Sequence, residues 1–300
     1  MDNKKLKSEN NKLVIAISSR ALFNLDQSHK IFKEKGIEAY AKHQQENEHV
    51  ILEPGVGFTL VKKLLKLNSK KTPIDVILLS RNSADTGLRI FNSIEHYDLN
   101  ISRAAFTRGE STHPFVGAFE ADLFLSSNYN DVQKALQSGY AAASIVESKS
   151  NNSHPSQLRI AFDGDAVIFS DEAERIFQEK GLEAFHENEI LSEKIELKAG
   201  PFKSFLVSLQ KIQSTFPEEN NPIRTALVTA RSAPSHRRVI HTMREWGIRI
   251  DESFFLGGLE KGVFLKQFAA DIFFDDQQQH CESASQYVPT GHVPSGIKNS

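Results

Sequence analysis

An internal repeat limits the folds open to this chain more than any other feature. Residues 15–40 match residues 160–185 at a constant offset of 145, with 11 of the 26 positions identical. Further along, the offset becomes 149 and brings residues 119–124 into register with residues 268–273. Because the matches keep the same order along the chain, they predict two structurally similar halves.

Strands and helices are expected to alternate within each half. We place the halves at residues 12–148 and 157–300, joined by a polar linker at 149–157. In the second half, short apolar runs predict strands, and apolar residues three or four apart predict helices. The expected strands are 158–162, 223–228, 248–255 and 271–274, and the expected helices are 172–185 (broken at Gly181), 202–216, 235–246 and 261–268. This alternation predicts an α/β fold of two tandem Rossmann-like parallel-sheet halves.

The composition indicates a globular protein and does not indicate nucleic-acid binding. Of the 300 residues, 39% are hydrophobic and 25% are charged, and the formal net charge is −2. A nucleic-acid-binding surface needs a clear basic excess, so no nucleic acid polymer is expected. The single cysteine, Cys281, suits a reducing compartment. No targeting segment or membrane-spanning run is visible, so we expect a cytoplasmic protein without a membrane partner.

The most informative stretch runs from Leu158 to Asp171 and reads LRIAFDGDAVIFSD. Asp163 and Asp165 lie between two apolar runs, at the edge of a predicted core. A carboxylate there is costly to bury unless it is paired or holds a metal. Taken alone, the pair fits a divalent-cation or nucleophile site, and it also fits an Asp-Gly β-turn.

Polar residues also follow the other predicted strands of this half. Thr229 and Asp275 each end an apolar run, Asp276 comes next, and Lys261 opens a helix between them. Ligands of open parallel sheets bind at the carboxyl ends of the strands. We therefore expect these side chains to gather at one edge of the sheet, beside Asp163.

Such a set of side chains suits phosphoryl transfer. Asp163 could attack phosphorus to form an aspartyl-phosphate, and Asp165 could protonate the leaving oxygen and then activate water. The phosphate-binding residues would be Thr229, Ala230 and Lys261. The Thr229 hydroxyl and the Lys261 ammonium would offset the charge that develops on the phosphoryl oxygens.

A divalent cation completes this chemistry, because it lets one anion approach another. The expected Mg²⁺ ligands are Asp163, Asp165 and Asp275, with a backbone carbonyl and Asp276 as further candidates. Asp276 could instead hold Lys261. Arg231 could reach the phosphate or pair with Asp276, and the sequence leaves both alternatives open.

These residues resemble the four motifs of the haloacid-dehalogenase-like phosphatases, with DGDAV at 163–167 as the first. The resemblance to the cytosolic 5′-nucleotidase I family covers nearly the whole chain, through SSRALF (18–23), NSIEHYDL (92–99), FDGDAVIFSDE (162–172), PIRTALVTARSA (222–233), FFDDQ (273–277) and GHVP (291–294). It implies Mg²⁺-dependent hydrolysis of nucleoside 5′-monophosphates, such as AMP, IMP or deoxynucleotides. It also implies the roles given above for Asp163, Asp165, Thr229, Lys261 and Asp275. A small cap over the site would lie at about 172–200.

We therefore predict a 5′-nucleotidase that works through an aspartyl-phosphate. One alternative is a phosphatase or phosphotransferase for another small phosphoester, which would share the chemistry and differ in the cap. A second alternative is a non-catalytic nucleotide sensor. The sequence leaves open whether the protein forms a homo-oligomer.

The first half lacks the acidic residues. In the repeat, Asp163 aligns with Ser18, Asp165 with Arg20, and Lys261 with Thr112, so this half is expected to be a catalytically dead copy. It could be a scaffold alone, or it could contact the substrate. It could also bind a nucleotide effector, with Arg20 and Asn82 as candidate ligand-binding residues.

Overall fold

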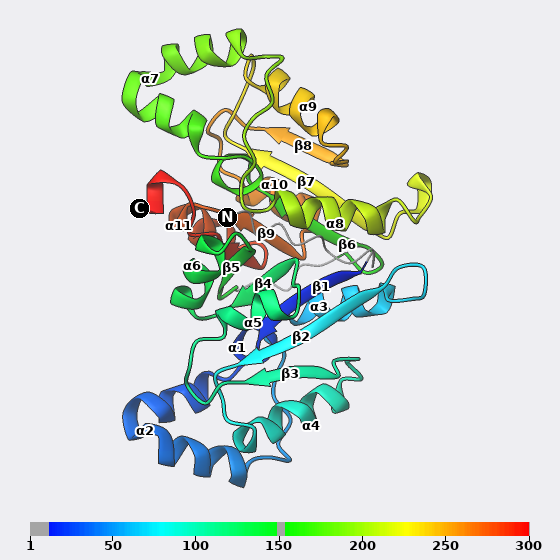
Figure 1. Ribbon diagram of the computed structural model, residues 1–300, viewed down its shortest axis with the longest axis vertical. Helices are drawn as coiled ribbons and strands as arrows, with labels where there is room; N and C mark the ends of the chain where they lie inside the picture. The colour runs from blue at the N-terminus through cyan, green and yellow to red at the C-terminus, as the bar shows by residue number, and fades with distance from the viewer. Residues whose placement is uncertain (1–11, 149–153, 300) are drawn as a thin grey trace.

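The computed structural model describes residues 12–148 and 154–299, and its centre is one 10-stranded β-sheet (Figure 1). The strands are β1 (Leu13–Ser18), β2 (Ile74–Ser80), β3 (Arg103–Phe106), β4 (Leu123–Ser126), β5 (Ala141–Val146), β6 (Leu158–Phe162), β7 (Ile223–Thr229), β8 (Glu252–Phe255), β9 (Ile272–Asp275) and β10 (Thr290–His292). Across the sheet they follow the order β3-β2-β1-β4-β5-β10-β9-β6-β7-β8. Neighbouring strands are parallel except for β5 and β10, which are antiparallel. The predicted mixed α/β, Rossmann-like sheet is therefore present.

The two halves of the sheet have the same strand order and meet at the antiparallel pair. In that pair, Val146 lies opposite Thr290, and Ser144 lies opposite His292. The strands form one continuous sheet, which the sequence did not predict. The reason is that β10 is only three residues long and has no apolar run that would announce a strand.

Helices cover the sheet and connect its strands. They are α1 (Ser19–Leu22), α2 (Asp26–Glu46), α3 (Phe58–Leu67), α4 (Leu88–His96), α5 (His113–Ala118), α6 (Tyr129–Gln137), α7 (Glu172–Leu191), α8 (Lys203–Gln213), α9 (His236–Glu245), α10 (Gly262–Phe268) and α11 (Gln278–Ala284). Short 3-10 segments lie at Asp85–Gly87, Glu218–Asn220 and Ile297–Asn299, and one π-type turn covers Gly164–Ile168. Five residues of the expected linker, 149–153, lie outside the described residues.

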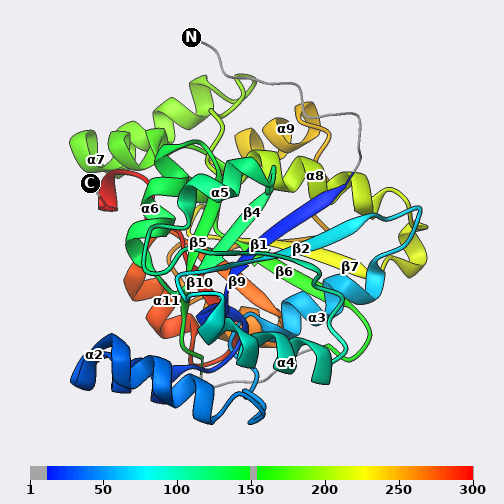
Figure 2. The same cartoon turned by 60° about the horizontal axis from the view of Figure 1, so that its bottom comes forward.

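Each half carries one long helix that is broken at a glycine. Gly36 in α2 has φ 80° and ψ −175°, and Gly181 in α7 has φ 82° and ψ −179°. This conformation is accessible almost only to glycine, so it breaks the helix at that residue. The predicted break at Gly181 is confirmed. Both helices project on the same side of the molecule, toward which the arrowheads of β2 and β7 point (Figures 1 and 2).

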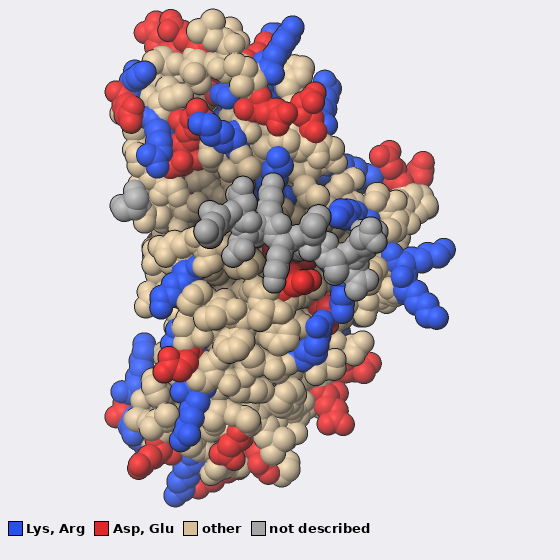
Figure 3. Space-filling view, in the orientation of Figure 1, with Lys and Arg blue, Asp and Glu red and all other residues tan. Residues whose placement is uncertain are grey.

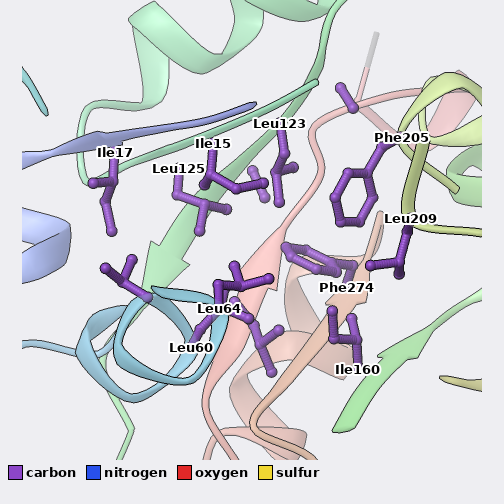
Figure 4. Packing of buried hydrophobic residues seen from close by; sticks show 14 of the residues in the cluster. Ile15, Ile17, Leu60, Leu64, Leu123, Leu125, Ile160, Phe205, Leu209 and Phe274 are labelled. Atoms are coloured by element: carbon purple, nitrogen blue, oxygen red, sulfur yellow. The ribbon is translucent and has the colours of Figure 1, made fainter. Parts of the chain in front are cut away.

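The main hydrophobic core is shared by the two halves. Helix α3 of the first half contacts β6 of the second, and α8 of the second half contacts β1 of the first. Apolar residues from all four elements and from β4 and β9 meet in one cluster, shown in Figure 4: Ile15, Ile17, Leu60, Leu64, Leu123, Leu125, Ile160, Phe205, Leu209 and Phe274. Burying this much apolar surface between the halves stabilises them against each other.

Two polar contacts related by the repeat lie at the rim of this core. Lys63 Nζ donates to Asp271 at 2.7 and 2.8 Å, and Ser208 Oγ donates to Asp122 at 2.7 Å. Lys63 aligns with Ser208 and Asp122 with Asp271 at the offsets of the repeat. The two halves therefore contact each other in a roughly two-fold symmetric way.

Acidic and basic side chains alternate over the face shown in Figure 3, without a large area of one sign. Within residues 12–148 and 154–299, no helix combines the length and the apolar character that crossing a membrane requires.

Candidate active site

Three neighbouring strands of the second half, β9, β6 and β7, deliver polar residues to one edge of the sheet. Asp163 directly follows β6, while Thr229 and Asp275 are the last residues of β7 and β9. Lys261 is the N-cap residue of α10. All four side chains are buried. The parallel register of these strands brings their ends together, because Phe162 pairs with both Leu227 and Phe274.

Three buried carboxyl groups form a compact acidic cluster here. One oxygen from each of Asp163, Asp275 and Asp276 lies within 4.8 Å of the others. Lys261 Nζ lies 2.9 Å from Asp163 Oδ1 and 2.6 Å from Asp275 Oδ2. One ammonium therefore faces three carboxyl groups, and the cluster keeps a negative excess when all of them are ionised.

The pKa values in the acidic cluster are pushed apart by burial and by the neighbouring charges. Burial, followed by the charges of Asp163 and Asp275, raises the pKa of Asp276 to about 9. Burial also raises the pKa of Asp163 to about 6, although Lys261 opposes the shift. Burial disfavours the charged form of Asp275 too, but Lys261 and His280 outweigh it and lower the pKa to about 2. The ion pairs with Asp163 and Asp275 overcome burial and raise the pKa of Lys261.

This donor set fits a hard divalent cation. Mg²⁺ prefers oxygen ligands, and carboxylates are its usual protein ligands. A cation held between Asp163, Asp275 and Asp276 would relieve the repulsion that raises the pKa of Asp276. Asp276 belongs to this group, whereas the carboxylate of Asp165 does not.

The Asp165 carboxylate instead pairs with Arg231. Arg231 Nε and Nη2 donate to the two carboxylate oxygens of Asp165, both at 2.8 Å. Its remaining nitrogen, Nη1, binds Glu189, which also accepts from Arg238 Nη1 at 2.9 Å. The ion-pair network of Asp165, Arg231, Glu189 and Arg238, in which Asp165 is half-buried and the other three are buried, thus joins the loop after β6 to α7 and α9.

This pairing corrects one expectation about Arg231. Of the two alternatives that the sequence left open, the pair with Asp276 is not found among the described residues, where Arg231 pairs with Asp165 and Glu189. A contact between Arg231 and phosphate stays a prediction. The guanidinium is 3% exposed, so a bidentate carboxylate pair is the arrangement that best compensates its burial.

Sequence reasoning missed Glu189 and Arg238. The repeat held a signal for both, because they align with Gln44 and Arg89. Those two residues are also buried and hydrogen-bonded, with Arg89 Nη1 donating to Gln44 Oε1 at 3.3 Å. Polar residues at matched positions of both halves, on two helices of each half, indicate a polar contact between those helices.

The remaining predicted residues of the second half are Thr229 and Ala230. Thr229 Oγ1 accepts from the Arg231 backbone N–H at 3.2 Å, which shapes the loop after β7. A Cβ at Gly164 would lie 3.3 Å from Thr229 Oγ1, so the residue next to Asp163 is kept small. Ala230 is exposed in the same loop, and its role in phosphate binding stays a prediction.

Arg20 and Asn82 lie in the first half, away from the acidic cluster. Both line a cavity at the carboxyl ends of β1, β2 and β4. This is the position that corresponds, through the repeat, to the acidic cluster of the second half.

Comparison with known proteins assigns the family. A family model described as 5′-nucleotidase matches residues 5–300, nearly the whole chain. The chain belongs to the 5′-nucleotidase family. The resemblance to the cytosolic 5′-nucleotidase I family is thereby confirmed, because a human protein named cytosolic 5′-nucleotidase 1B is 40% identical over 290 residues.

The alignment with this 5′-nucleotidase relative covers 92% of the chain and 48% of the human protein, so the chain spans about half the length of that curated relative. No solved structure matches the chain significantly. The acidic cluster and the four ion-paired side chains of Asp165, Arg231, Glu189 and Arg238 lie within the segment that the 5′-nucleotidase family model matches.

Proposed function

We propose that the protein is a Mg²⁺-dependent 5′-nucleotidase that hydrolyses nucleoside 5′-monophosphates, such as AMP, IMP or deoxynucleotides. The main support is Asp163, a buried carboxylate at a strand end, beside Lys261 and within a group of three carboxyl groups. A buried strand-end carboxylate paired with a lysine suits a nucleophile toward phosphorus. Membership of the 5′-nucleotidase family supports the choice of substrate.

In the first step, an Asp163 carboxylate oxygen attacks phosphorus, and the bond from phosphorus to the nucleoside 5′-oxygen breaks. Asp165 gives a proton to that leaving oxygen. The Lys261 ammonium and the Thr229 hydroxyl interact with the phosphoryl oxygens and offset their charge. The first products are a nucleoside and an aspartyl-phosphate on Asp163.

In the second step, Asp165 takes a proton from water, whose oxygen attacks phosphorus and releases Asp163. Both oxygens of Asp165 are engaged by Arg231 in the structure. We therefore propose that Asp165 leaves Arg231 when substrate binds, so that its carboxyl group can reach the leaving oxygen.

We place Mg²⁺ on Asp163, Asp275 and Asp276, where it would supply positive charge to the phosphate and reduce the repulsion between nucleophile and substrate. Asp165 is also a predicted metal ligand. Because its carboxylate binds Arg231, we propose that Asp165 would offer its backbone carbonyl oxygen to the metal.

The finer description of the fold is also a proposal. Equal strand order in the two halves supports haloacid-dehalogenase-like repeats at 12–148 and 157–300, the first of them catalytically dead. Helix α7, within residues 172–200, would form the cap of the second half. A cytoplasmic location is supported by the name of the human relative, cytosolic 5′-nucleotidase 1B. A nucleotide effector and a homo-oligomer remain predictions.

A phosphate-release panel tests the activity. AMP, IMP, a deoxynucleotide and several sugar phosphates are incubated with the protein in Mg²⁺ or in EDTA, beside Asp163→Asn. We expect release from the nucleotides in Mg²⁺ only, and a loss of at least a thousandfold in kcat for Asp163→Asn, since that variant removes the nucleophile.

The matched control is Asp98→Asn, which makes the same chemical change at an exposed aspartate outside the site. It should hydrolyse nucleotides at the rate of the unmodified protein. Activity on sugar phosphates alone would contradict the proposed substrate class. No Mg²⁺-dependent release from any substrate would contradict the proposed activity and favour a nucleotide sensor.

A further inference from the structure

The first half contains a cavity of about 800 Å³, which is a typical size for a small-molecule site. It lies between the carboxyl ends of β1, β2 and β4 and the kinked helix α2. Its lining includes Ser18, Arg20 and Asn82 from the strand ends and Phe32 and Ile37 from α2. The sheet edge of this half therefore still encloses space for a ligand.

The loops around the cavity keep the local geometry of the catalytic half. Ser80 Oγ accepts from the backbone N–H two residues further on, at 3.2 Å, just as Thr229 Oγ1 does at its aligned position. Ser126 Oγ accepts from the N–H of Asn128 at 3.1 Å, and the aligned Asp275 Oδ1 accepts from Gln277 at 2.8 Å. The substitutions have therefore changed the chemistry of this edge without changing the form of its loops.

The described residues of the first-half cavity do not form a metal site. The described residues hold one group of three or more potential metal ligands, and it is the acidic cluster of the second half. A ligand in the first-half cavity would consequently be bound without a bridging metal ion, through hydrogen-bond donors and positive charge.

Two unpartnered donors lie in this cavity. Arg20 Nε and Asn82 Nδ2 are buried and, within the described chain, have no hydrogen-bond partner. Tyr40 donates to Asn82 Oδ1 at 2.7 Å, which fixes the amide and leaves its NH₂ group free. A buried donor without an acceptor costs free energy, so a ligand in the cavity that brings an acceptor to either group would relieve that cost.

The second half shows what the repeat has removed. Arg20 aligns with Asp165 and Asn82 with Arg231, which are the two partners of the bidentate ion pair. In the first half, Arg20, a donor, replaces the acceptor Asp165. The neutral amide of Asn82 replaces the cationic Arg231. Two donors thus remain where a closed pair stood, and an anionic ligand would satisfy both.

The charge around the cavity also favours an anion. Three arginines and two aspartates line it. One arginine, Arg81, is already neutralised by a bidentate pair with Asp131 at 2.8 and 2.7 Å. Among the described residues, the ion pair of Arg20 is a 3.3 Å contact with Asp26, whose side chain is 64% exposed, and such exposed pairs contribute little.

The opposite wall suits a flat, apolar group. Phe32 and Ile37 are 45% and 61% exposed, although both are large hydrophobic residues. The Phe32 ring lies edge-on to Tyr40 at 6.0 Å and is stacked with His29 at 6.3 Å. An aromatic ring of a ligand would cover apolar surface here that is otherwise left to water.

We propose that the first-half cavity binds a nucleotide without metal, with its phosphate at Arg20 and Asn82 and its base against the Phe32 wall of α2. This site goes beyond the proposed reaction, and it does not depend on it. Binding there is expected in EDTA, where the acidic cluster of the second half repels phosphate.

Titration calorimetry in EDTA tests the proposal, with AMP, adenosine and inorganic phosphate as probes. We expect saturable binding of AMP, and at least tenfold weaker binding of adenosine and of phosphate alone. Asp163→Asn should bind AMP with the affinity of the unmodified protein, because the ligand is not at the acidic cluster.

Two variants locate the phosphate. Arg20→Ala should weaken AMP binding at least tenfold, since hydrogen bonds to charged groups are among the stronger ones. Asn82→Asp keeps an acceptor for Tyr40 but replaces the free donor with a negatively charged oxygen. It should therefore also weaken the binding of AMP at least tenfold and leave the affinity for adenosine unchanged. The matched control, Arg175→Ala, removes an exposed arginine on α7 and should change neither.

Several results would overturn the proposal. They are the absence of saturable AMP binding in EDTA, equal affinity for AMP and either fragment, AMP affinity unchanged in both variants, or tighter AMP binding by Asp163→Asn with the number of sites per chain unchanged. Thermal melts of each variant verify that it is folded. None of these readouts uses enzymatic activity, so failure here and failure of the proposed reaction are distinguishable.

Discussion

Asp276 lies where the charges of the protein itself disfavour a carboxylate. It is buried beside Asp163 and Asp275, and its pKa is raised from 3.8 to about 9. Its carboxyl group is therefore protonated at neutral pH unless a cation joins the acidic cluster. A residue that costs stability in the absence of a ligand is expected at a functional site.

This shift predicts how stability depends on pH. The folded state holds the Asp276 proton more tightly than the unfolded state, so the resulting stabilisation is complete below pH 3.8 and is lost as the pH rises through about 9. Asp163, with a pKa of about 6, acts in the same direction at lower pH. In EDTA, the melting temperature of the protein should fall between pH 7 and pH 9, mainly because of Asp276.

Asp276→Asn isolates the effect. In EDTA at pH 8 the variant should melt higher than the unmodified protein, by about 2–4 °C for each kcal/mol gained, and its melting temperature should change less from pH 7 to 9. Added Mg²⁺ should stabilise the unmodified protein more than the variant. A lower melting temperature of the variant in EDTA would contradict this explanation. Asp98→Asn, with the same change at an exposed site, should show the same change in melting temperature from pH 7 to 9 as the unmodified protein.

At the scale of elements, ion pairs connect helix α7 to the loop after β6, which carries Asp165. Glu189 on α7 is buried between Arg231 and Arg238, and Arg231 holds Asp165. Phe185, one turn earlier on the same helix, lies 5.6 Å from the Arg231 guanidinium. Movement of α7 would therefore change the position of Asp165, the proposed acid and base.

Glu189→Gln tests this connection. The variant leaves two buried guanidinium groups short of a negative partner, so we expect a loss of about 3 kcal/mol in the free energy of unfolding and a lower kcat for nucleotide hydrolysis. Denaturant unfolding and phosphate release measure the two effects. Glu193→Gln makes the same change in a half-exposed pair with Arg237 at 3.4 Å and should cost little. Equal, small effects of both variants would show that α7 is not tied to the site in this way.

Most regular elements of the second half follow from local sequence pattern. The runs at 158–162 and 223–228 predict β6 and β7 because every second residue or more is apolar and buried. Helix α7 continues to Leu191, beyond the expected end at 185, because polar residues such as Glu189 find buried partners that its own sequence does not reveal. Strand β10 has no local signal and exists because β5 and β9 offer it hydrogen bonds.

Gly55 and Gly200 align at the repeat offset of 145, and the structure shows a physical reason for both. A Cβ at Gly200 would lie 2.3 Å from the Phe169 carbonyl oxygen, and one at Gly55 would lie 2.9 Å from the Ala21 carbonyl oxygen. Both glycines lie where the chain returns against the strand-end loop, next to the isolated bridges at Phe169–Ala199 and Phe23–Pro54. Sequence spacing alone aligns these glycines, but it does not show which backbone they approach.

The sequence predicts which residues of the candidate site follow the ends of strands. It does not predict in which direction their side chains point. Strand order brings Asp163, Lys261 and Asp275 together. The choice of Asp165 between the cluster and Arg231 depends on a residue of α7 24 positions later, Glu189, which holds Arg231 in place. No local pattern around Asp165 carries that information.

At the scale of the whole molecule, the shared core predicts that the two halves unfold together. Leu64 on α3 is 1% exposed and packs with Phe205, Leu209 and Phe274 of the other half. Trp246, the single tryptophan, lies in the second half with its ring 5.6 Å from that of Phe169. Its fluorescence therefore reports on the second half alone.

Leu64→Ala in the first half should lower the melting transition of Trp246 in the second. Large-to-small changes in a core cost about 2–5 kcal/mol, so the shift should be several degrees and equal to that seen by circular dichroism. The aligned Leu209→Ala should have a similar effect, while Leu191→Ala, at an 84% exposed position, should have none. A Trp246 transition that stays in place while circular dichroism shows a separate, earlier one would mean that the halves unfold independently.

We propose that one half of this repeated fold performs the chemistry, through Asp163. The most direct test is acid quenching of the protein during turnover of a nucleotide labelled in its 5′-phosphate, followed by peptide mapping. The account predicts one labelled peptide, the one that contains Asp163, and no label in Asp163→Asn. Label on a different residue, or hydrolysis by Asp163→Asn at the rate of the unmodified protein, would contradict it.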